Sequence, residues 1–180
     1  MLSQRNVIHT DDQLHIGSKY LKYHIRMYVE TLLWLQDHLS FAEWDTVRNA
    51  MLEDHLIHTR ILINFISKSD AHERKDDVLA IDFFHELYDV FHPLQDDFLE
   101  SQADSIGGHL VHITTKPMPK LKSEQEWLIR ETASKLVTAL KTFLDVVPET
   151  RMVDGARIEC LKHLARLSPP LIPISLSAST

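Results

Sequence analysis

The stretch NAMLEDHLIHTRILINF, residues 49–65, decides the fold of this chain. On a helical wheel of 100° per residue it separates a wide apolar stripe from a narrow polar one. With its flanking residues, the apolar stripe contains Trp44, Val47, Met51, His55, His58, Leu62 and Phe65. The polar stripe contains Thr46, Asn49, Glu53, Arg60, Asn64 and Ser67. Apolar residues also cover much of the remaining circumference, which predicts a central, largely buried helix.

The residues before this stretch predict a second long helix. Apolar residues recur every three, four or seven positions from Leu14 to Leu39, which is the spacing of an amphipathic helix. Ser40 and Glu43 then form a capping box that starts the next helix, expected over 41–67. Because the connection is so short, the helices 14–39 and 41–67 should pack antiparallel.

The rest of the chain shows weaker helical patterns. The segment 78–92 is expected to be a short helix, with an extended apolar segment as the alternative. A further helical pattern runs from about Leu94 to Ile106, and Gly107-Gly108 should break or loosen it. The remaining expected elements are a helix over 124–147 that opens at a Ser123/Glu126 capping box, a short helix over 155–167 and a flexible tail over 168–180. The sequence therefore predicts an all-α bundle of four to five helices, with a single domain over 1–167.

The composition of the chain excludes several kinds of protein. The 180 residues carry 26 acidic and 19 basic side chains, a net charge of −7, whereas phosphate-binding surfaces usually show a basic excess. A lone cysteine, Cys160, excludes an intramolecular disulfide and a cysteine-rich zinc site. The polar N-terminus is unlike a signal peptide and no apolar run is long enough to cross a membrane. We therefore expect a cytoplasmic protein without a membrane segment.

The polar stripe of the central helix has two interpretations. It is either the solvent-facing edge of a long helix or a polar seam inside the bundle or at a dimer interface, where unpaired charges would be costly. The second interpretation predicts a binding surface for a second copy or another protein that includes Asn49, Glu53, Arg60 and Asn64 of the stripe. His58 and His112 are further candidate binding residues.

The histidines suggest a metal site as one alternative. His55 and His58, three positions apart on the apolar stripe, could share a metal ion, and His109 and His112 repeat this spacing. The four imidazoles would form one site only if their two segments faced each other across the core. Otherwise His55 and His58 are ordinary core histidines with hydrogen-bond partners. No glycine-rich phosphate loop or nucleophile motif occurs, so no cofactor is expected.

Several motifs in order resemble a known group of proteins. RNAMLEDHLIHTRILINFI (48–66), DDVLAIDFF (76–84), GHLVHIT (108–114) and Trp127 resemble a group of uncharacterised bacterial proteins that is similar to HEPN domains (higher eukaryotes and prokaryotes nucleotide-binding). The resemblance spans roughly residues 14–147. It implies a helical bundle, either an RNA-cleaving toxin or defence protein or an inactive binding module.

The ribonuclease motif of HEPN domains is incomplete here. It places four to six residues between an arginine and a following histidine, so that a cation stabilises phosphate charge while imidazole transfers protons. No arginine precedes His109 or His112 at that spacing; Arg48 before His55 and Arg157 before His163 match the spacing elsewhere, as often as chance predicts.

Three hypotheses about function follow. The first is a non-enzymatic or degenerate HEPN-like module that binds a partner or a nucleotide-like ligand, in phage defence or toxin–antitoxin control. The second is a metal-independent ribonuclease that uses Arg48 and His55. The third is a histidine-based metal-binding bundle.

Overall fold

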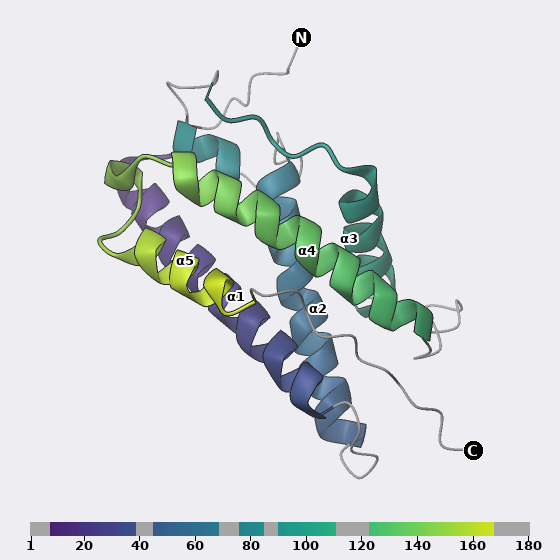
Figure 1. Cartoon of the computed structure of the whole chain (residues 1–180). Coiled ribbons are helices and arrows are strands. Elements are labelled where there is room, and N and C mark those ends of the chain that lie inside the picture. Colours follow the sequence, from purple (N-terminus) through teal and green to yellow (C-terminus); the bar gives the residue numbers. More distant parts are fainter. Residues whose placement is uncertain (1–7, 39–44, 69–75, 85–89, 111–122, 168–180) are drawn as a thin grey trace, which may run out of the picture.

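The computed structural model describes residues 8–38, 45–68, 76–84, 90–110 and 123–167, and at 45, 109–110 and 123–128 it describes the backbone alone. The described residues form an all-α bundle, as predicted. The α-helices are α1 (Asp11–His38), α2 (Asp45–Ser67), α3 (Asp97–Leu110), α4 (Ser123–Val146) and α5 (Ala156–Ala165), and the 3-10 helices are η2 (Ala80–Phe84) and η3 (Glu149–Arg151). Figure 1 shows α4 lying across α2 and α5 lying along α1.

The two longest neighbouring helices, α1 and α2, pack antiparallel, which confirms the prediction. The imidazole of His24 contacts that of His58, and two turns further along α1, Thr31 contacts His55. As residue numbers increase along α1, the residue numbers of their neighbours on α2 decrease. The start of α1 is fixed by reciprocal bonds: Thr10 N–H donates to Gln13 Oε1 (2.9 Å) and Gln13 N–H donates to Thr10 Oγ1 (3.3 Å), which is a capping box.

Helix α5 covers a different side of α1. Lys22 pairs with Glu159, and eight residues further along α1 Glu30 pairs with Arg166, so α5 runs parallel to α1. The Ser18 hydroxyl of α1 accepts the backbone N–H of Val153 (2.9 Å), which lies just before α5. The opposite side of α1 faces α2, and the histidine contacts between the two helices lie there.

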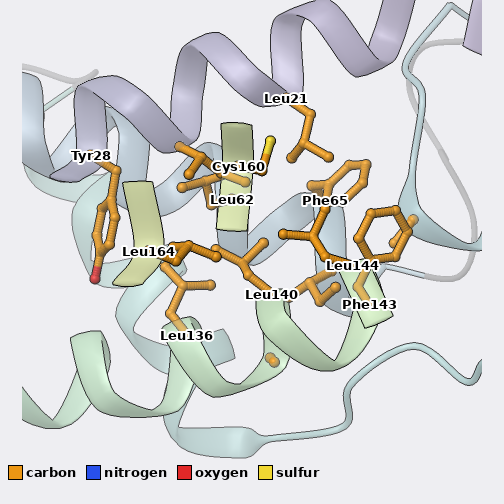
Figure 2. Packing of buried hydrophobic residues seen from close by; sticks show 14 of the residues in the cluster. Leu21, Tyr28, Leu62, Phe65, Leu136, Leu140, Phe143, Leu144, Cys160 and Leu164 are labelled. Atoms are coloured by element: carbon orange, nitrogen blue, oxygen red, sulfur yellow. The ribbon is translucent and has the colours of Figure 1, made fainter. Parts of the chain in front are cut away.

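All five α-helices that the structure describes contribute to one core. Figure 2 shows Leu62 and Phe65 of α2 among Leu136, Leu140 and Phe143 of α4. The Phe143 ring makes edge-on contacts with four aromatic rings, Phe65, Phe83, Phe84 and Phe91. Cys160 is fully buried in the same core and burial raises the pKa of its thiol to about 12, so it is a packed small residue as the sequence predicted.

Three local predictions were wrong or only partly right. Helix α3 continues through Gly107-Gly108 to Leu110, because Gly107 is a packing position: a Cβ there would lie 2.9 Å from Cζ of Arg60. Val47 is exposed rather than part of the core, since it lies at the start of α2, where α1 has ended. Of the helix expected over 78–92, the structure has the 3-10 turn η2, and residues 85–89 lie outside the described part.

Other predictions are confirmed or remain open. Helix α4 ends within a residue or two of the predicted position and α5 lies inside the predicted 155–167. In the described part of the chain, every helix is too short or too polar to span a bilayer. The expected tail, 168–180, and the Ser40/Glu43 capping box lie outside the described residues.

Candidate functional site

Three histidines gather between α1 and α2 and form what we call the imidazole cluster: His24, His55 and His58. Nδ1 of His24 lies 2.8 Å from Nδ1 of His58, and Nε2 of His58 lies 3.5 Å from Oδ1 of Asp54. The ring of Tyr23 packs edge-on against both His24 and His58. Asp54 and His58 are one turn apart on α2, so helical spacing alone places the carboxylate beside the imidazole.

These contacts favour one set of proton positions. A hydrogen bond between two Nδ1 atoms needs a single proton, and the Asp54 carboxylate favours an N–H on Nε2 of His58. Nδ1 of His58 is then the acceptor and Nδ1–H of His24 is the donor. Nε2 of His24, at the end of the series Asp54–His58–His24, remains a hydrogen-bond acceptor.

His55 has a separate set of partners. The hydroxyl of Thr31 donates to the carbonyl of Met27 (2.8 Å), so its oxygen accepts from Nδ1–H of His55 (3.1 Å). The imidazole also stacks on the ring of Tyr28, with 4.9 Å between ring centroids. His55 is only 2% exposed, so it is a core histidine whose Nδ1 has a hydrogen-bond partner.

Burial keeps the cluster uncharged at neutral pH. Burial lowers the pKa of His55 to about 4, and burial together with the neighbouring His58 lowers the pKa of His24 to about 4. Burial also lowers the pKa of His58, although the Asp54 carboxylate acts in the opposite direction. All three imidazoles are therefore neutral at pH 7, because removing a cation from water is costly.

The Arg48/His55 pair of the ribonuclease hypothesis lies on one helix, but its histidine does not reach solvent. His55 is covered by Tyr28 and Thr31 of α1, whereas Arg48 is partly exposed near the start of α2. A phosphate group could contact this imidazole only if α1 and α2 separated.

The four histidines of the metal hypothesis are not brought together as far as the structure describes them. His55 and His58 face α1, while α3 meets α2 at Arg60, about 160° away from His58 on the helical wheel. The side chain of His109 and all of His112 lie outside the described residues. Within the described part of the chain, no group of three or more His, Cys, Asp or Glu residues is arranged to hold a metal ion.

The polar stripe of α2 divides into two parts. Asn49 and Glu53 are exposed, whereas Arg60 and Asn64 are partly buried. The solvent-edge interpretation therefore describes the first half of the stripe. In the second half, α3 covers Arg60 through its contact with Gly107, and Asn64 lines the cleft described next.

A cleft of about 430 Å³ lies between α1, α2 and residues 76–79. Its lining is mostly apolar, with Leu21, Leu62 and Phe65 among the residues that separate it from the core. The full set of lining residues is His9, Gln13, Ile16, Gly17, Tyr20, Leu21, His24, Ile61, Leu62, Asn64, Phe65, Asp76, Asp77, Val78 and Leu79. His24 belongs both to this wall and to the imidazole cluster, so the two features are continuous.

The sequence interpretation missed the α1 half of this site, including His24, Thr31 and Tyr20. A signal was present: Ile16, Tyr20 and His24 are one turn apart and share a face of the predicted helix. Their pairing with α2 could not be read from that spacing, since it depends on the register of the two helices.

Comparison with known proteins adds no functional information: no family model, no curated protein and no solved structure matches the chain. The resemblance to HEPN domains therefore stays a prediction.

Proposed function

We propose that this chain is a non-enzymatic binding module whose site is the cleft between α1, α2 and residues 76–79. The observation that carries the proposal is the cleft itself. Its volume of about 430 Å³ lies within the range of small-molecule pockets, which combine apolar walls with a few polar groups.

Residues 76–79, which line one side of the cleft, are packed against α1. Gly17 allows Val78 to approach α1 closely, because a Cβ at position 17 would lie 2.9 Å from Cγ1 of Val78. Nε2 of His9 lies 3.2 Å from the carbonyl oxygen of Asp77, which ties the same segment to the chain before α1. Residues 76–79 therefore pack against α1 and form one side of the cleft.

Its polar groups can orient a ligand. The side-chain amide of Asn64 makes no hydrogen bond with another described residue, although it lines the cleft. Nε2 of His24 is an acceptor, given the proton positions favoured by Asp54 and His58. A ligand with an apolar body would replace water on Ile16, which is 52% exposed, and on Ile61.

The ribonuclease alternative has less support. His55 is buried, and no lysine or arginine is among the described residues that line the cleft, so neither place offers a phosphate a cation beside an accessible imidazole. We expect the purified protein to leave RNA intact with and without EDTA. Cleavage that survives EDTA and disappears in His55→Ala would overturn the binding-module proposal, and EDTA-sensitive cleavage would favour a metal site.

Ligand binding can be tested with isoleucine methyl groups as reporters. In a titration of isotope-labelled protein with 1-hexanol, the methyl resonances of Ile16 and Ile61 should shift and saturate. Ile158 on α5 is exposed but lies outside the cleft, so its methyl resonance is the internal control. If no resonance shifts, or if Ile158 shifts in parallel with Ile16 and Ile61, the cleft is not a ligand site.

A further inference from the structure

We propose that His9 is a positioning residue of the cleft: its imidazole holds residues 77–82 in place, so that ligand affinity depends on a side chain that precedes α1. This inference rests on the proposed binding function and assigns a residue through which that site is organised. It is carried by the contacts of one atom, Nε2 of His9, with both ends of the segment 77–82.

Nε2 of His9 lies beside two oxygen atoms from opposite ends of this segment. It is 3.2 Å from the carbonyl oxygen of Asp77 and 3.5 Å from Oδ2 of Asp82. A carbonyl and a carboxylate only accept hydrogen bonds, so Nε2 of His9 carries a hydrogen and donates it. One N–H group is therefore within reach of both ends of the segment.

The side chains that make this contact are shielded from water. That of His9 is 3% exposed and that of Asp82 is 4% exposed. Burial strengthens a polar contact, because water competes less for the donor and the acceptors. Replacing the imidazole by a side chain without a donor should therefore cost more here than at an exposed position.

Asp82 connects His9 to the side of the cleft. Its Oδ2 accepts the backbone N–H of Leu79 (2.7 Å), and its own backbone N–H donates to the carbonyl of Leu79 (3.0 Å). Leu79 lines the cleft. The position of Leu79 therefore follows that of Asp82, which lies against His9.

The position of His9 is in turn set by helix α1. His9 directly precedes Thr10, which forms the capping box with Gln13, so the chain enters α1 in a defined direction. Further along α1, Gly17 lies against Val78. Residues 77–82 therefore contact this part of the chain at two places, and the contact at His9 is the one made by hydrogen-bonding atoms.

Two substitutions of similar length separate a positioning role from a simple lining role. His9→Gln keeps an N–H that can donate to the carbonyl of Asp77, and His9→Met has none. Since His9 also lines the cleft, a simple lining role predicts that the more apolar methionine binds 1-hexanol at least as tightly. We expect His9→Met instead to raise the dissociation constant about threefold to tenfold, the factor for one hydrogen bond, and His9→Gln to stay within about twofold of the wild type.

His15→Met is the matched control, because it removes a comparable contact away from the cleft. Nε2 of His15 lies 3.0 Å from the carbonyl oxygen of Thr150, and His15 is not among the lining residues. This variant should bind 1-hexanol like the wild type. The nuclear Overhauser effect between Hα of Gly17 and the methyl protons of Val78 is a second readout, which should persist in His9→Gln and weaken in His9→Met.

One measurement needs no substitution and so does not depend on the folding of any variant. The nitrogen chemical shift of Nε2 of His9 in the wild type should be that of a protonated nitrogen, because its neighbours are acceptors. An unprotonated Nε2 would overturn the proposal.

The possible outcomes separate this proposal from the binding function. If His9→Met binds 1-hexanol like the wild type, or if His15→Met weakens binding as much, the positioning role is overturned and the binding function stands. Weakening by His9→Gln as large as that by His9→Met would also overturn the positioning role. If the wild type does not bind 1-hexanol at all, both proposals are overturned.

Discussion

Mild acid should destabilise this protein through the imidazole cluster before its carboxylates titrate. The ordinary pKa of histidine, 6.5, falls to about 4 for His55 in the folded protein. The unfolded chain therefore binds this proton more readily, and the stabilisation is complete above pH 6.5 and is lost as the pH falls toward 4. At about 1.4 kcal/mol per pH unit of difference, His55 contributes about 3 kcal/mol, of which about 2 kcal/mol is lost by pH 5.

Other titratable groups also lower the free energy of unfolding as the pH falls, and the pH range in which each acts distinguishes them. The lowered pKa values of His24 and His58 add to the loss over the same pH range. The pKa values of Glu30 and Asp96 are lowered mainly by their bonds to Arg166 and Lys135, so their contributions are lost below their ordinary values of 4.5 and 3.8. The interval from pH 6.5 to 5 therefore reports mainly on the histidines.

Urea unfolding at a series of pH values between 7.5 and 5 measures this effect directly. His55→Phe keeps the stack on Tyr28, and Thr31 loses no acceptor for its own hydrogen. The variant should therefore lose about 2 kcal/mol less than the wild type between pH 7.5 and pH 5. His92→Phe, at an exposed position, is the control and should behave like the wild type. If His55→Phe and the wild type lose the same free energy of unfolding, the buried neutral imidazole is not the cause.

Chemical denaturation of further single variants should give different changes in the free energy of unfolding. Gly17→Ala should lower the free energy of unfolding by about 1–2 kcal/mol, because its Cβ would press on the branched side chain of Val78; Gly108→Ala, with open space around it, should raise it by about 0.5–1 kcal/mol, and the opposite order would contradict the packing described. Phe143→Ala should cost about 3–5 kcal/mol, and a loss below 1 kcal/mol would show that its ring is not central to the core. Tyr28→Phe should be neutral or stabilising by about 1 kcal/mol, since the buried hydroxyl has no partner among the described residues; a clear loss of stability would reveal a missed hydrogen bond.

The long helices could be predicted from sequence because their apolar residues recur at helical spacing. The expected helix 14–39 differs from α1 mainly at its start, Asp11, since the Thr10/Gln13 capping box precedes the first apolar residue and was not recognised. The error at Gly107-Gly108 has a different origin. Glycine is a poor helix former, but contact with Arg60 of another helix outweighs that local preference.

The candidate site could be predicted only in part. The wheel of residues 49–65 placed His55 and His58 on the buried side of the helix, and the structure confirms this for both. Their partners His24 and Thr31 lie 34 and 24 residues away in sequence, so they depend on how α1 and α2 slide against each other. The cleft depends further on residues 76–79 folding back onto Gly17, a contact that no local pattern specifies.

The measurement that tests the binding function most directly compares two isoleucine-to-glutamate variants by the dissociation constant of 1-hexanol. Ile61→Glu places a carboxylate on the cleft wall, and Ile158→Glu places the same group on the exposed side of α5. We expect Ile61→Glu to weaken 1-hexanol binding by about tenfold or more, roughly the transfer free energy of two buried methylene groups, while Ile158→Glu binds like the wild type. Equal dissociation constants for the two variants would contradict the cleft as the binding site.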